Sequence, residues 1–289
     1  MMRRKIEQSW RGACAGIFAG LLFSAVVARS HGDFHIVIGA ANEDITKDPT
    51  NPEPYLRRAE LFRIHEQYTN AAADIASAEI LAPTLPGLDI VKARLFLDTG
   101  WPLSARAHLD RFLKIVTNSV DGYTLRSRAW AQLGQPLYAA EDFARAIAVT
   151  PEGAPDLYIE RAHSLAAAGA ENLDAAIITL DQGIKRMGPL VTLQLTAIDL
   201  EVRRKNYDGA LARVDTVLQR SPRKESWLSR KGEILLQAGR PAEAKKAYSE
   251  ALTALNTLPP ARRNVPAVAD LERRIRLELE LLDSTAPKP

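Results

Sequence analysis

The stretch GEILLQAGRPAEAKKAYSEA, residues 232–251, contains the pattern that decides the fold of this chain. A small residue, Gly232, is followed three positions later by the apolar Leu235 and then by a turn glycine, Gly239. After the turn comes a second small residue, with apolar residues four and seven positions later: Ala244, Tyr248 and Ala251. Residues three and four positions apart share one face of an α-helix, so the stretch predicts two amphipathic helices joined by a tight turn.

The same pattern recurs along the chain with a nearly constant period. The small residue of the second helix stands at Ala71, Ala105, Ala139, Ala176, Ala210 and Ala244, with spacings of 34, 34, 37, 34 and 34 residues. The residues four positions later are all apolar: Ile75, Leu109, Phe143, Leu180, Val214 and Tyr248. The first helix has small residues at Ala59, Ala93, Ser127, Ala162 and Gly232, with Ile198 as the exception. A helix pair repeated at a fixed period predicts a solenoid, in which each unit buries its apolar face against its neighbours.

The turns of the repeat have their own pattern, and two copies depart from the general one. Four turns carry a glycine that suits a left-handed cap: Gly100, Gly134, Gly169 and Gly239. Pro83, Pro151 and Pro222 follow the second helices, because proline cannot continue a helix. In the fifth copy Glu201 stands at an apolar position, so we expect Leu200 or Val202 to pack there instead. The fourth copy is three residues longer, around Ala170 and near Gly153.

These residues resemble the tetratricopeptide repeat (TPR) family over residues 52–258. The resemblance implies an all-α, right-handed superhelical solenoid of about six helix-turn-helix repeats with terminal capping helices. We expect residues 31–51 to form a lead-in and a half-repeat helix. Residues 259–289 are expected to form a linker, a charged capping helix and a frayed tail.

Residues 1–30 have the parts of a secretory signal: a basic start, an apolar run and small residues placed for cleavage before Arg29 or His31. The leader predicts an exported protein, in the bacterial periplasm. The alternative is a membrane anchor formed by residues 13–28, although this run is shorter than the roughly 20 residues that span a bilayer. The leader holds five bases and one acid, so the remaining chain has 33 bases and 34 acids and gives no reason to expect nucleic-acid binding.

Motifs of enzymes and cofactor sites are missing from the sequence. It contains no G-x-G-x-x-G, phosphate loop, H-E-x-x-H or G-x-S-x-G, and its single cysteine, Cys14, lies in the leader. The sequence therefore favours a scaffold or adaptor that binds a protein or peptide, with no enzymatic activity and no cofactor.

The resemblance implies that the first helices of the repeats line a concave face that holds the partner. One inward row follows the small residues directly: Glu60, Arg94, Arg128, His163, Asp199 and Glu233. A second row lies one turn earlier: Leu56, Ile90, Thr124, Ile159, Leu195 and Ser229. We expect the second row to bury apolar parts of a partner, while Arg94 and Arg128 bind a carboxylate or phosphate. Two plainer interpretations stay open: the arginines pair with neighbouring acids, and the second row is inter-repeat core.

Two alternative functions rest on other residues. If cleavage falls before His31, its free amine and imidazole would bind a metal, with His35 or Asp33 as a further ligand, in a metal-binding protein. An envelope enzyme that cleaves glycans would need two inward acids, for which Asp199 and Glu233 are the adjacent candidates.

Overall fold

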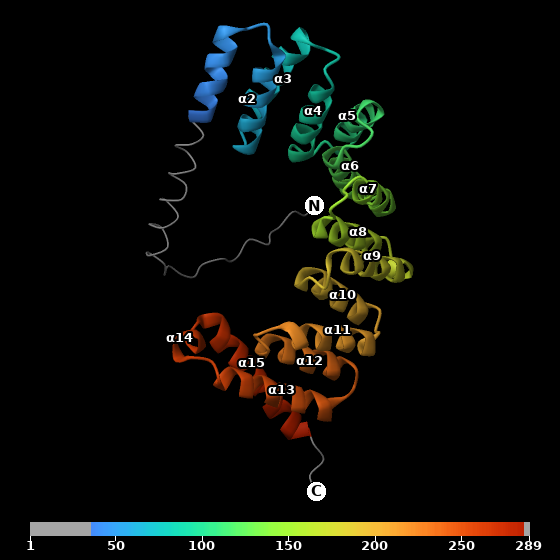
Figure 1. Cartoon of the computed structure of the whole chain (residues 1–289), viewed down its shortest axis with the longest axis vertical. Helices are drawn as coiled ribbons and strands as arrows, with labels where there is room; N and C mark the ends of the chain where they lie inside the picture. The colour runs from blue at the N-terminus through green and yellow to red at the C-terminus, as the bar shows by residue number, and fades with distance from the viewer. Residues whose placement is uncertain (1–35, 286–289) are drawn as a thin grey trace, which may run out of the picture. The chain divides into compact units, whose positions relative to one another are not determined.

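A computed structural model describes residues 36–285, which are helical apart from turns and short loops. Figure 1 shows the helices following one another as hairpin pairs along the chain. The chain consists of two compact units, with the boundary between Val91 and Lys92. The prediction of an all-α repeat fold is confirmed.

Each repeat consists of an A helix and a B helix. The A helices are α2 (Pro52–Ile64), α4 (Pro86–Asp98), α6 (Val120–Gln132), α8 (Pro155–Ala167), α10 (Val191–Arg203) and α12 (Glu225–Gln237). The B helices are α3 (Tyr68–Leu81), α5 (Pro102–Ile115), α7 (Pro136–Ala148), α9 (Leu173–Met187), α11 (Tyr207–Arg220) and α13 (Pro241–Asn256). A short 3₁₀ helix, η1 (Ala170–Asn172), occupies the lengthened turn of the fourth copy. Before α2, residues 36–47 form a further helix.

The residues that define the repeat form the core. All six small residues that mark the B helices are completely buried: Ala71, Ala105, Ala139, Ala176, Ala210 and Ala244. The apolar residues four positions later are no more than 5% exposed. In the last repeat, position 232 requires glycine because the ring of Tyr248 lies against it. A Cβ at Gly232 would be 2.7 Å from Cε1 and Cζ of Tyr248. Small residues thus let the helices approach, and the large B-helix residues fill the space between them.

The A-to-B turns require a left-handed residue. Gly100, Gly134 and Gly239 have φ angles of 78°, 69° and 71°. The first and fifth repeats adopt the same conformation without glycine, at Glu66 (φ 59°) and Lys205 (φ 62°). A residue with a Cβ is strained in this region, so these two turns are less favourable than the glycine turns.

The turns give a paired prediction. Lys205→Gly should raise the free energy of unfolding by roughly 0.5–1 kcal/mol, because it relieves left-handed strain. Gly134→Ala should lower it by about 1 kcal/mol, since the new Cβ adds strain although no atom lies within 4 Å of it. Urea unfolding of both variants checks the signs. The opposite sign for either would show that the turns do not limit stability.

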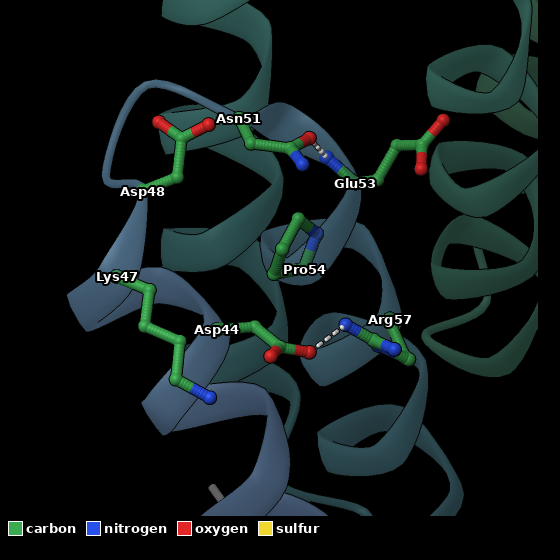
Figure 2. Close-up of a pocket in the computed structure, with 7 residues that line it drawn as sticks. All are labelled: Asp44, Lys47, Asp48, Asn51, Glu53, Pro54 and Arg57. Atoms are coloured by element: carbon green, nitrogen blue, oxygen red, sulfur yellow. Dashed lines mark hydrogen bonds and ion pairs between the residues drawn. The ribbon is translucent and has the colours of Figure 1, made fainter.

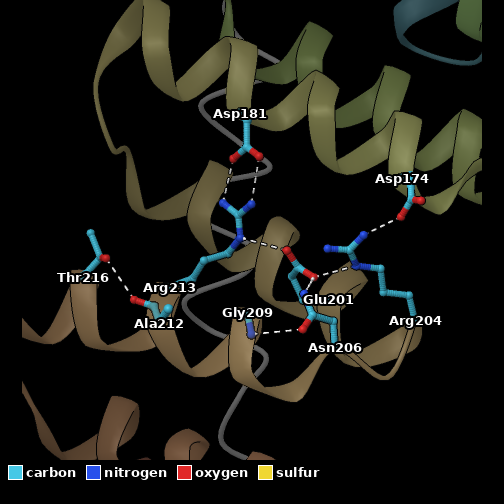
Figure 3. Close-up of polar contacts among 9 residues, drawn as sticks. All are labelled: Asp174, Asp181, Glu201, Arg204, Asn206, Gly209, Ala212, Arg213 and Thr216. Carbon is cyan, nitrogen blue, oxygen red and sulfur yellow. Dashed lines mark hydrogen bonds and ion pairs between the residues drawn. The ribbon is translucent and has the colours of Figure 1, made fainter.

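The fifth repeat contains an acid in its core. Glu201 is 3% exposed, and Figure 3 shows it between two arginines. Its carboxylate accepts a hydrogen bond from Arg204 Nε at 2.7 Å and forms an ion pair with Arg213 Nε at 3.5 Å. Leu200 is also buried, as expected, but Glu201 does not turn away to solvent. The expectation that an apolar neighbour simply replaces it was therefore incomplete, because the arginines compensate for its burial.

Two further helices close the C-terminal end: α14 (Pro260–Arg263) and α15 (Pro266–Thr285). Leu271 and Ile275 of α15 are buried in one hydrophobic cluster with Leu255 of α13. Charged residues occupy the other side of α15, which therefore covers the apolar face of the last repeat as a cap does.

The cap predicts a pH effect. Hydrogen bonds from Arg263 and Arg276 lower the pKa of Glu272 from its ordinary 4.5 to about 2. Because the folded pKa lies below the unfolded one, this contribution to stability is present above about pH 4.5 and is lost as the pH falls towards 2. Glu272→Gln should remove that part of the pH dependence of the free energy of unfolding. If stability falls with acid in the variant as it does in the wild type, Glu272 is not the group responsible.

Candidate functional site

The predicted inward residues differ in their exposure. The exposed group consists of Arg128, His163, Leu195 and Asp199. The partly buried group consists of Glu60, Ile90, Arg94, Thr124, Ile159 and Glu233. Leu56 and Ser229 are buried, as expected if this part of the row is inter-repeat core. The exposed A-helix residues of the second unit are therefore the ones that a partner can reach.

Several of these inward residues form ion pairs with neighbouring charged side chains. Arg94 of α4 forms an ion pair with Asp121 of α6. Arg230 lies between the two candidate catalytic acids: its Nη2 is 2.7 Å from Asp199 Oδ1, and its Nη1 is 3.0 Å from Glu233 Oε2. A guanidinium thus fills the space in which a glycosidase would hold its substrate bond and water.

Arg128 differs from Arg94. It is exposed on α6, and among residues 36–285 the structure gives it no hydrogen bond and no ion pair. Its charge is therefore available to an anionic group of a partner, whereas an acid must be displaced before Arg94 can bind one.

A hollow lies one turn beyond Arg128. Its volume is about 420 Å³, and it is lined by Ala131, Gly134, Pro136, Glu160, His163, Ser164 and Ala167. Gly134 lies in the turn between α6 and α7 and Pro136 begins α7, whereas the remaining lining comes from α6 and α8. Small residues form the hollow, because Ala131 and Ala167 are exposed where longer side chains would fill the space.

The chemistry of the hollow is mixed. Ser164 donates its hydroxyl hydrogen to the carbonyl of Glu160 within α8, at 2.8 Å. His163 and the Glu160 carboxylate are exposed and remain available as hydrogen-bonding groups at the rim. A small apolar side chain fits against the alanines, with polar contacts on one side and Arg128 one turn away.

A second hollow, in the first unit, has less to offer. Figure 2 shows the residues that line it, which come from the helix at 36–47, from α2 and from the loop between them. Its volume is about 450 Å³. Its polar groups are engaged with one another: Arg57 pairs with Asp44 at 2.7 Å, and Asn51 caps α2 by accepting from the Glu53 amide at 3.0 Å. Hydrogen bonds from Thr50 lower the pKa of Asp48. The hollow in the second unit is therefore the better candidate site.

Within residues 36–285, no three His, Cys, Asp or Glu side chains are grouped so that they could hold a metal ion. The predicted metal ligands His31 and His35 lie outside the described residues, as do the leader and the candidate anchor. None of the described helices combines the length and apolar character needed to cross a bilayer.

The comparisons with known proteins agree with the fold. Residues 160–265 match the family described as tetratricopeptide repeat-like domain. Curated protein sequences give no significant match.

Three solved structures are similar over most of their length. The C-terminal part of a TPR repeat-containing protein from Cytophaga hutchinsonii has a TM-score of 0.58 at 13% identity, covering 89% of this chain and 93% of that one. A tetratricopeptide repeat protein from Parabacteroides merdae has a TM-score of 0.51 at 16% identity, covering 91% and 97%. YrrB, a TPR protein described with an unusual peptide-binding site, has a TM-score of 0.52 at 17% identity, covering 66% and 97%. The six helix pairs therefore have the fold of tetratricopeptide repeat proteins, and the segment at 160–265 matches the tetratricopeptide repeat-like domain.

Proposed function

We propose that this chain is a non-enzymatic scaffold that binds an extended segment of a protein partner on its A-helix face. The observation that carries the proposal is the hollow between α6 and α8, with the exposed Arg128 one turn away. The peptide site of YrrB supports it as a property of another protein with this fold.

The surroundings of the hollow indicate the chemistry of the segment. The alanine floor suits a small apolar side chain, and Arg128 suits a carboxylate a few residues away. His163 and Glu160 provide hydrogen bonds that orient the bound backbone or a polar side chain. The partner segment therefore combines a small apolar residue with an acid.

Filling the hollow tests this function. Ala167→Trp places a large ring where an exposed methyl group now lies, so the fold should be preserved and binding should fall at least tenfold. Ala107→Trp on α5 is a matched control, because Ala107 is also exposed but lies outside the hollow. Proteins that each variant captures from envelope extract are quantified by mass spectrometry. Equal capture by Ala167→Trp and the wild type would contradict the proposal.

Export is part of the same proposal and is supported by the sequence of residues 1–30. We expect mass spectrometry of the protein from its native source to find a mature N-terminus at Arg29 or His31. Recovery of the intact N-terminus in the soluble cytoplasmic fraction would contradict export and leave the binding site unaffected.

A further inference from the structure

Bases on the A helices form a recurring contact with acids on the B helices. The base stands directly before the small A-helix residue, as Arg58, Arg126, Arg161 and Lys231 do. In the first unit, Arg58 donates from Nε and Nη2 to both oxygens of Asp74, at 2.7 and 2.6 Å, and from Nη1 to Asn42 at 2.6 Å. The Nε–Nη2 edge of the Arg58 guanidinium thus faces α3, the B helix of the same repeat. Its Nη1 faces the helix at 36–47, which precedes that repeat.

The third repeat has the same arrangement. Arg126 donates from Nε and Nη2 to Asp142 of α7 at 2.7 and 2.8 Å, and from Nη1 to Asp110 of α5 at 2.8 Å. In the sixth repeat Lys231 pairs with Asp215 of the preceding α11 at 2.6 Å. An acid or amide from the preceding B helix therefore completes each of these contacts.

The fourth repeat lacks both acids. By the register of the repeat, the place of Asp142 is taken by Thr179 of α9, and the place of Asp110 is taken by Ala144 of α7. Thr179 is buried and donates its hydroxyl hydrogen to the Ala175 carbonyl. Arg161 is left without a carboxylate among residues 36–285, and its Nε is buried without a hydrogen-bond partner.

The electrostatics of Arg161 agree with this geometry. Burial lowers the pKa of Arg161, whereas the hydrogen bond with Asp74 raises that of Arg58. Arg161 as a whole is partly exposed, so a group from outside can reach it. A half-buried guanidinium without an acid is costly, and an added carboxylate gains more there than at a solvated arginine.

We propose that a carboxylate side chain of a partner protein docks on Arg161, in the place that Ala144 leaves open at the junction of α7 and α8. The acid would take the part that Asp110 plays for Arg126. Ile178 precedes Thr179 on α9 and is 56% exposed, which gives the partner an apolar surface on the same helix. Arg161 itself is on the A helix α8, but the residues beside the proposed contact, Ala144 and Ile178, are on B helices, and none of the three lines the hollow between α6 and α8.

Acetate serves as the probe, because it is the smallest carboxylate. In the full chain labelled with ¹⁵N-arginine, the Nε–Hε signal of Arg161 should shift and saturate as acetate replaces chloride at constant ionic strength. The signal of Arg126, which already has two acids, should stay in place. An Arg161 signal that moves no more than that of Arg126, or that responds to phosphate but not to acetate, would overturn the proposal.

Two substitutions sharpen the test. Ala144→Asp supplies the missing acid from within the chain, so the Arg161 signal should be displaced from the start and should no longer respond to acetate. Ala144→Asn, of nearly the same size, should respond as the wild type does. Thr179→Asp, with the acid on the other edge, carries the same expectation if Ala144→Asp does not fold. If the Arg161 signal of the folded Asp variant still responds fully to acetate, the proposal is overturned. Ala167→Trp should leave the acetate response of Arg161 unchanged, whatever its effect on binding at the hollow.

Discussion

Asp142→Ala is expected to lower the free energy of unfolding by about 3 kcal/mol, because it leaves a largely buried guanidinium with one acid instead of two. Asp142 is completely buried and accepts hydrogen bonds from Arg126 at 2.7 and 2.8 Å. The Arg126 side chain is only 16% exposed, so water cannot replace the lost carboxylate. Urea unfolding followed by circular dichroism measures the change.

Glu141→Ala is the matched control for Asp142→Ala. Glu141 is the preceding residue on α7, but its carboxylate is exposed and is 3.7 Å from Arg145, which is exposed as well. Its removal should cost less than about 0.5 kcal/mol. Equal effects of the two substitutions would show that the buried contact between the A and B helices does not hold the repeats together.

Tyr248→Ala should be the more damaging change, at about 4 kcal/mol, because it opens a large cavity in the core of the last repeat. Tyr248 is 1% exposed and lies against the backbone of Gly232, so α12 cannot move closer without repacking. Burial also raises the pKa of its hydroxyl. Thermal and urea unfolding both report the loss.

Tyr248→Phe separates the ring from the hydroxyl. It keeps the packing against Gly232 and should cost less than about 1 kcal/mol. A large effect of Tyr248→Phe would assign the stability to the hydroxyl, and a small effect of Tyr248→Ala would contradict the role of Tyr248 as the central core residue of this repeat.

The helices and their core could be predicted because they follow from local periodicity. Ala105 and Leu109, four residues apart, must share a helix face, and each repetition of the pattern confirms the register of the next. The turn glycines are equally local. That Lys205 adopts the same left-handed conformation follows from the register, because it stands one period before Gly239.

The polar contacts between repeats were harder to predict, because they depend on which side chains meet across repeats. The sequence leaves open whether Arg94 binds a partner or a neighbouring acid, and only the fold shows that Asp121 reaches it. Glu201 departs from the apolar pattern of the repeat. The nearby Arg204 and Arg213 were a sequence signal that its buried charge is paired.

The hollow itself was not predicted from the sequence. His163, which lines the hollow, was expected on the inward face. The alanine floor of the hollow was not expected, because the small side chains of Ala131 and Ala167 form no recognisable sequence motif. Small residues four positions after Ser127 and five after Ala162 were the available signal. At the position of Ala167 the other copies have longer side chains, such as Arg203 and Gln237, so the alanine there indicates a site.

A photo-cross-linking amino acid placed in the hollow tests the central claim most directly. Incorporated at Ala131 or Ala167 in the native source, it should give one cross-linked partner, with a partner peptide that contains an acid. The same group at Ala107 should give none. Cross-links of equal yield from Ala107, or none from either hollow position, would contradict binding on the A-helix face.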